Sequence, residues 1–231
     1  MSELFSIQLQ NRQQQGRDGV WLDLPTTTEQ VQAALRQIGI SSDNPQGLFI
    51  SGYFAEEEKR FAIPYNMVLA SNVDELNFLA SRLETLSTGE RAELNAALQA
   101  PQSELSSIGK ITDFPENVEY YVHLPDVHGP AQLGDYYLNR SGMVDMPEEW
   151  KGGIDTAQFG RYVAQQEQGV FTEYGYLVKS GDAWQKVHEG QPVPEEYRVL
   201  SFPASEILRD AANIPPPVQP ETEPQKVIPI I

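Results

Sequence analysis

The chain of 231 residues contains no cysteine. This absence excludes disulfide scaffolds, thiolate metal centres and cysteine nucleophiles. A chain that uses no disulfide fits the reducing cytosol, so we expect a cytoplasmic protein. No apolar run approaches the roughly 20 residues that cross a bilayer. The opening MSELFSIQLQ also lacks the basic region of a secretory signal, so the sequence predicts neither a membrane span nor export.

Basic residues are scarce as well. Lysine and arginine number 16 against 33 aspartates and glutamates, which gives a formal net charge of −17. Nucleic acid and anionic membranes would repel such a chain, so the charge argues against both as direct ligands and favours a basic partner. Residues 101–160 have the largest excess, with ten acidic and three basic side chains. These acids are spaced along the chain, which predicts display by folded structure, although acids that only maintain solubility are the ordinary alternative.

The first part of the chain has the pattern of a small α/β module. Leu4 to Leu9 and Val20 to Leu24 predict a β-hairpin. Thr26 to Thr28 then predict the N-cap of a helix whose apolar positions repeat at helical spacing until Gly39. The run LFISGYF (48–54) predicts a third strand. We therefore assign residues 1–63 to an N-terminal α/β module.

A change of period after Pro64 predicts a helical middle module over residues 64–110. Ser71 or Asn72 is expected to cap one amphipathic helix, and Thr88 is expected to cap another. Both helices are too short to be stable alone, so we expect them to pack on each other or on the flanking modules.

The next part of the chain predicts a second α/β module over residues 111–203, which is also the most acidic part. The expected strands are VEYYVHL (118–124), VFTEYGYLV (170–178), 183–187 and an edge strand at 199–202. The expected helices are one that covers 133–138 and ends near Gly142, and one that begins at Asp155 or Thr156 and is ended by Gly169. Proline density predicts an extended, flexible tail over 204–231. The fold class is therefore α+β, an elongated chain of small modules with mostly antiparallel sheets.

The sequence offers no catalytic motif. The nucleophile elbow, the phosphate-binding loop, the dinucleotide fingerprint and the zincin helix are all absent. His123, Asp126 and His128 are a conceivable zinc set, but Pro125 and a strand-to-loop setting fix no common face for them. Adjacent acids such as Glu148 and Glu149 are interpreted as solvated charge, and the tyrosines of the acidic module as core and interface anchors. We expect no catalytic residue, no cofactor and no metal, and hence no enzyme.

Five segments, in order along the chain, resemble the ArdA family of antirestriction proteins of mobile genetic elements. They are GVWLDLPTTTEQVQAALRQIGI (19–40), LFISGYFAEE (48–57), NVDELNFLASRLETL (72–86), LPDVHGPAQLGDYYLNRSG (124–142) and GVFTEYGYL (169–177). The first and fourth are the more specific, because a strand ending in Leu-Pro before a capped helix, and a Leu-Gly-x-Tyr-Tyr element after an acidic loop, are unusual together. Lys59 and Arg60 depart from an ideal acidic pattern, and the tail lies outside the resemblance.

The resemblance implies an elongated three-part chain, often dimeric through its C-terminal part, that imitates the bent DNA bound by type I restriction–modification enzymes. Such a protein occupies the DNA groove of the methyltransferase core and performs no catalysis. Local charge, rather than a family motif, selects nine expected contact residues: Asp113, Glu116, Glu119, Asp126, Asp135, Asp145, Glu148, Glu149 and Asp155. The alternative is a mobile-element adaptor that binds another basic regulator or defence nuclease. The target enzyme, the effect on modification, the oligomeric state and the role of the tail stay open.

Overall fold

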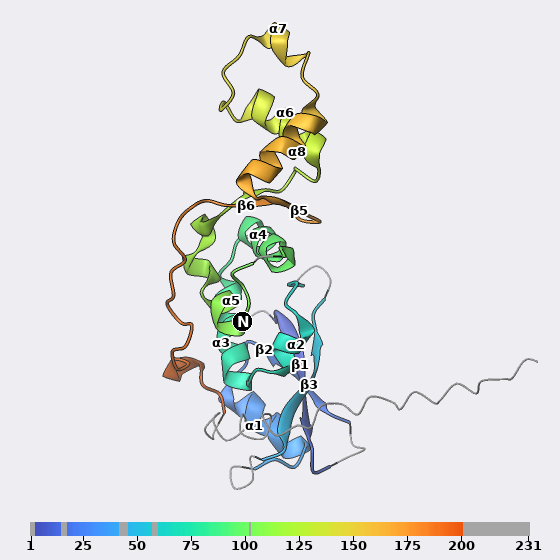
Figure 1. Cartoon of the computed structure of the whole chain (residues 1–231). Coiled ribbons are helices and arrows are strands. Elements are labelled where there is room, and N and C mark those ends of the chain that lie inside the picture. The colour runs from blue at the N-terminus through green and yellow to red at the C-terminus, as the bar shows by residue number, and fades with distance from the viewer. Residues whose placement is uncertain (1–2, 15–17, 42–45, 57–59, 102, 201–231) are drawn as a thin grey trace, which may run out of the picture.

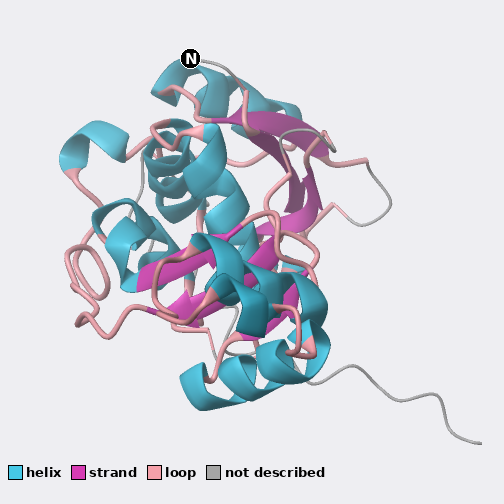
Figure 2. Ribbon diagram, turned by 90° about the horizontal axis from the view of Figure 1, so that it is seen from above, coloured by secondary structure: helices cyan, strands magenta, loops and turns pink. Residues whose placement is uncertain are grey.

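The computed structural model describes residues 3–14, 18–41, 46–56, 60–101 and 103–200. Two small antiparallel sheets and the helices around them form an α+β fold, which confirms the predicted class. Along the long axis of the body the N-terminal sheet, a group of helices, the second sheet and a final group of helices follow one another (Figure 1). Figure 2 looks down this axis. The predicted tail, 204–231, lies outside the described residues, and the predicted module boundaries stay predictions.

The N-terminal sheet contains β1 (Phe5–Asn11), β2 (Val20–Leu24) and β3 (Leu48–Phe54). β1 lies in the centre and pairs antiparallel with both neighbours, so the predicted hairpin and third strand are confirmed. Phe5, Ile7 and Leu9 alternate along β1 and are fully buried, as expected for a strand with one face against a core.

Five helices follow or cover this sheet: α1 (Thr28–Gln37), α2 (Tyr65–Leu69), α3 (Val73–Glu84), α4 (Thr88–Gln99) and α5 (Ile108–Thr112). Thr27 and Asn72 are the N-caps of α1 and α3, each with a reciprocal capping box, as the sequence predicted. The N-cap of α4 is Ser87, one residue before the predicted Thr88, because the Ser87 hydroxyl accepts the Glu90 N–H while the Glu90 carboxylate accepts the Ser87 N–H.

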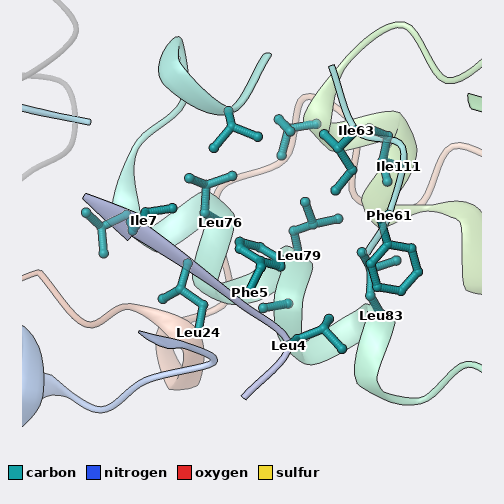
Figure 3. Close-up of a cluster of buried hydrophobic side chains, with 14 of the residues drawn as sticks. Leu4, Phe5, Ile7, Leu24, Phe61, Ile63, Leu76, Leu79, Leu83 and Ile111 are labelled. Atoms are coloured by element: carbon teal, nitrogen blue, oxygen red, sulfur yellow. The ribbon is translucent and has the colours of Figure 1, made fainter. Parts of the chain in front are cut away.

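The main core lies between the N-terminal sheet and α3. Figure 3 shows Phe5, Ile7 and Leu24 from the sheet facing Leu76 and Leu79 of the helix. The same buried cluster continues through α4 and α5 into the second sheet. A continuous core of this kind couples the two sheets, because separating them would expose apolar surface to water.

The described part of the C-terminal half contains a second sheet, three α-helices and one π-helix. The elements are the short helical turns η2 (Phe114–Glu116) and η3 (Val118–Tyr120), strand β4 (Tyr121–Leu124), helix α6 (Pro130–Asp135), the π-helix η4 (Tyr136–Arg140), helices α7 (Glu148–Lys151) and α8 (Thr156–Glu167), strands β5 (Val170–Thr172) and β6 (Gly175–Lys179), and the turn η5 (Glu195–Tyr197). The strand order is β4-β6-β5, with antiparallel pairs.

Two predicted strands in this half have different bounds. The predicted strand 118–124 begins only at Tyr121, because the Tyr120 N–H bonds to the Asn117 carbonyl and closes a 3₁₀ turn. The predicted strand 170–178 is a hairpin of β5 and β6. Gly175 makes the turn with φ of +121°, a conformation that favours glycine.

The predicted strands at 183–187 and 199–202 are wrong for the residues that the structure describes. The backbone N–H and carbonyl of Gln185 both bond to the side chain of Asn117. The backbone N–H groups of Val199 and Leu200 bond to the carboxylate of Asp74. Side chains therefore take the hydrogen bonds that a neighbouring strand would need, and residues 201–202 lie outside the described part.

Residues 125–168, here called the tip, form the far end of the body in Figure 1. Helices α6 and α8 cross there in close contact over Gly134 and Gly160. A small second core of Val127, Leu133 and Tyr176 lies beneath them. The tip is therefore a compact unit built on few buried residues. Across the whole described part of the chain, no helix combines the length and apolar character that spanning a membrane requires.

Candidate functional site

The nine acidic residues selected from the sequence differ in exposure. Six are exposed: Glu119, Asp126, Asp145, Glu148, Glu149 and Asp155. Asp135 and Glu116 are partly exposed, and Asp113 is buried. Charge counting along the sequence therefore selected mostly surface carboxylates.

Asp113 is not available as a surface charge, which corrects its selection as a contact residue. Its side chain has no exposed surface. The carboxylate accepts hydrogen bonds from the backbone N–H groups of His188, at 2.6 Å, and Glu189, at 3.3 Å. A buried carboxylate needs such donors because losing water would otherwise be costly. Asp113 therefore holds a distant segment of the chain in place.

Glu116 is compensated by the guanidinium of Arg82. Its carboxylate forms an ion pair with Arg82 of α3 and lies 3.9 Å from His188 Nε2. Glu104 is a similar case, because it accepts hydrogen bonds from Lys179 Nζ at 2.9 Å and the Tyr120 hydroxyl at 3.2 Å. The Lys179 bond is the main reason why the pKa of Glu104 lies below its usual value. Neither carboxylate presents an uncompensated charge.

The tip displays the largest group of the expected carboxylates. Residues 125–168 contain seven acidic and three basic side chains, a formal net charge of −4. Glu148 and Glu149 occupy the first turn of α7, and Glu148 forms one ion pair, with Lys151 at 2.6 Å. Asp155 caps α8 by accepting the Gln158 N–H at 3.0 Å. Short helices and caps therefore hold these charges on ordered backbone.

Two carboxylates that the sequence did not select belong to the same half. Asp182 is exposed and lines a cavity of about 510 Å³ together with Glu116 and Glu119. Glu167 accepts hydrogen bonds from the hydroxyls of Tyr137 in the tip and Tyr176 of β6. Burial and the Glu167 charge raise the pKa of both tyrosines above their usual value, so they remain neutral donors. The sequence Ser180–Gly181–Asp182 is typical of a turn, and it is a signal that could have placed Asp182 at the surface.

Two of the three histidines, His123 and His188, have structural partners for their rings. His123 Nε2 lies 2.7 Å from the Tyr174 carbonyl oxygen, across the second sheet. His188 packs edge-on against Phe78, with 5.0 Å between ring centroids. Within the described ranges, His, Cys, Asp and Glu form no group of three arranged to hold a metal ion. The conceivable His123–Asp126–His128 set is therefore not assembled as a metal site.

The fold and these surface charges describe a small acidic α+β protein with carboxylates displayed on an ordered tip. Residues 15–178 match the family model of the antirestriction protein ArdA, and the chain belongs to this family. Membership implies an antirestriction protein that acts against type I restriction–modification enzymes, an inhibitor and not a member of a known enzyme family. Comparison with curated proteins found no match.

One carboxyl outside the tip has a strongly shifted pKa. Glu93 of α4 is partly buried, and its Oε1 atom has no hydrogen-bond partner. Burial, together with the negative charge of Glu90, raises the pKa of Glu93 to about 8. The folded protein therefore holds a proton on Glu93 that the unfolded chain releases near 4.5, the ordinary pKa of a glutamate.

We expect Glu93→Gln to raise the melting temperature at pH 8.5 and to leave it almost unchanged near pH 4. Because the folded-state pKa is the higher one, Glu93 makes the free energy of unfolding fall as pH rises from about 4.5 to about 8. Glutamine copies the neutral acid and removes this loss of several kcal/mol, so a gain on the order of 10 °C is expected at pH 8.5 from thermal melts across this range. Exposed Glu195→Gln is the control and should not alter the slope. Equal melts at pH 8.5 would contradict the raised pKa.

Proposed function

We propose that this protein is a DNA mimic that inhibits type I restriction–modification enzymes by placing its ordered acidic surface in the DNA groove of the methyltransferase core. Six exposed carboxylates selected from the sequence support this proposal, five of them on the tip. The formal net charge of −17 supports it as well. The target groove binds a polyanion, so it must present lysine and arginine side chains.

The arrangement of the tip is the observation that carries this proposal. B-DNA has about one negative charge per 1.7 Å of its axis, on a stiff scaffold. At the tip, Glu148 and Glu149 lie on α7 and Asp155 caps α8, so their positions are set by helices. Ordered charges lose less conformational entropy on binding than a flexible acidic tail would. The tip therefore meets a basic groove with its carboxylates already in place.

A second candidate function, an adaptor that binds another basic regulator or defence nuclease, is favoured by exposed apolar side chains on the same tip. Met143, Trp150 and Tyr162 are 76%, 66% and 60% exposed. Large exposed apolar side chains are typical of protein contacts, and a homodimer would be another use for them. In an adaptor complex or a homodimer, apolar contact, rather than charge, would dominate the free energy of binding.

The first test is competition with DNA. Purified protein is expected to displace a labelled duplex that contains the recognition site from a type I methyltransferase core at 50 mM salt. Raising salt to 200 mM should weaken binding at least about tenfold, because screening removes electrostatic attraction and steering. Fluorescence anisotropy of the labelled duplex measures both the displacement and its dependence on salt. Failure to displace DNA from several such cores, with direct binding also absent, would remove the proposed function.

A further inference from the structure

Residues 180–200, here called the strap, follow β6 and return along one side of the body toward the N-terminal half. Figure 1 shows this segment as the orange to brown trace that runs from β6 past α5 and α3. The turn η5 (Glu195–Tyr197) is its main regular element. The strap begins after residue 178, where the family match ends. The strap therefore makes a second connection between the second sheet and the N-terminal half, in addition to the segment from α2 to η3 that joins the two sheets along the chain.

The first attachment of the strap lies beside the second sheet. The Ser180 N–H donates to the Tyr120 carbonyl at 2.9 Å, and the ring of Trp184 packs edge-on against Tyr120 at 5.2 Å. The Asn117 side chain then accepts the Gln185 N–H at 2.7 Å and donates to the Gln185 carbonyl at 2.9 Å. One buried amide thus satisfies both backbone groups of a strap residue.

The second attachment is the buried carboxylate of Asp113. It follows α5 and accepts the backbone N–H groups of His188 and Glu189. Hydrogen bonds to an ionised acceptor are about twice as strong as neutral ones. The ring of His188 also packs against Phe78 of α3. The middle of the strap is therefore held by charge and by aromatic contact.

The third attachment joins the strap to α3. Asp74 Oδ1 accepts the backbone N–H groups of residues 199–200 at 2.8 and 2.9 Å. Asn77 donates to the Tyr197 carbonyl at 3.0 Å and accepts the Thr26 N–H, from the end of β2, at 2.7 Å. Val199 itself is buried in the main core. The strap thus ends against α3 and the main core.

We infer that the strap is a positioning element, which fixes the orientation of the tip relative to the N-terminal sheet through the buried side chains of Asp74, Asn77, Asp113 and Asn117. This inference rests on the proposed function, because a mimic needs its charges at fixed separations. Four buried polar side chains that bond chiefly to one irregular segment are costly unless every bond is made, so they favour a single docked arrangement. A strap that only added stability is the alternative.

A covalent staple separates positioning from stability. A Cβ built on Gly109 of α5 would lie 3.7 Å from Glu189 Cβ, within the usual range of about 3.5–4.5 Å for a disulfide. The chain has no other cysteine, so a Gly109→Cys/Glu189→Cys pair forms without competing partners. The staple would hold the strap in place without the carboxylate of Asp113. It would be reversible by reductant.

The first experiment measures orientation in the full chain. Spin labels on Gln37→Cys at the end of α1 and Gly152→Cys on the tip report the distance between the two ends. We expect a narrow distribution for the parent chain and a broad or shifted one after Asp113→Ala. Gln185→Pro, which deletes a strap N–H at an exposed residue, is the second variant if Asp113→Ala does not fold. A folded variant with an unchanged narrow distribution would overturn the inference.

The second experiment measures competition with duplex DNA. Asp113→Ala is expected to compete about tenfold less well. Without the docked strap, the orientation of the tip must be fixed during binding, and the entropy lost in this step weakens the affinity. Adding the oxidised staple should restore competition to within about twofold of the parent chain, and reductant should remove the gain. A staple that restores the melting temperature but not competition would show a strap that only stabilises. If the parent chain does not compete, the proposed function fails, while the label distances still decide the role of the strap.

Discussion

Replacing Glu148 and Glu149 together with lysine is expected to weaken competition against duplex DNA by about 100-fold. Both side chains are exposed on the first turn of α7, and Glu148 forms an ion pair with Lys151. In a groove lined with lysine and arginine, the new cations would face like charges, which costs several kcal/mol when the groups are close. The measurement is the concentration of variant that displaces half of the labelled DNA at 50 mM salt.

The chain supplies a matched control in Glu195 and Glu196. The two pairs lie in similar local sequences, Met-Pro-Glu-Glu-Trp and Val-Pro-Glu-Glu-Tyr, and each begins a short helical turn. Both pairs are exposed, and lysine at both positions changes the net charge equally. Competition by the Glu195–Glu196 variant should weaken less than about fivefold, because only the change in the net charge of the whole protein would affect binding. Equal losses would contradict a contact surface at the tip.

The same comparison separates the mimic from the adaptor. If both charge-reversed variants keep full binding and Trp150→Ala abolishes it, apolar contact dominates and the mimic is wrong. Trp150 is 66% exposed, so its removal leaves the described core intact. Retained folding is checked by circular dichroism for every variant. Loss of binding in the Glu148–Glu149 variant alone supports the proposed function.

Much of the fold could be predicted because local rules decide it. The hairpin of β1 and β2 follows from alternation, and the capping boxes at Thr27 and Asn72 follow from residue spacing. Gly39, which the sequence marked as a helix stop, has φ of +70° just after the end of α1. These signals lie within a few residues of the structure that they specify. The α+β class therefore followed from the sequence alone.

The strap could not be predicted, because its hydrogen bonds join residues far apart in the sequence. Asp113 bonds to N–H groups 75 and 76 residues away, and Asp74 bonds to groups 125 and 126 residues away. Apolar residues near Ala183 and Val199 suggested strands, but side chains take the place of a partner strand. This long-range contact also explains why the expectation that Asp113 lies at the surface was wrong. Counting charges along the chain gives no information on which carboxylate will meet buried N–H donors.

Replacing Gly160 with alanine is expected to disrupt the tip and to lower its stability by about 3 kcal/mol. A Cβ at this position would lie 1.8 Å from the Pro130 carbonyl oxygen and 2.8 Å from the Gly134 backbone nitrogen. Alanine favours a helix by about 1 kcal/mol relative to glycine, but relief of this overlap requires α6 and α8 to move apart. The second core beneath the two helices has three buried residues. We therefore expect that it cannot repack to compensate when α6 and α8 move apart.

Hydrogen exchange tests this expectation because it reports each part of the chain separately. Amides of α6 and α8 should lose protection in Gly160→Ala, while amides of α3, in the main core, should keep it. Competition with DNA should fall with the tip, since the carboxylates of α7 and Asp155 lose their fixed positions. Gly152→Ala is the matched control, because a Cβ there meets no atom within 4 Å. Protection of α6 and α8 equal to that of the control would contradict the close helix crossing, whereas lost protection with full competition would mean that binding does not depend on an ordered tip.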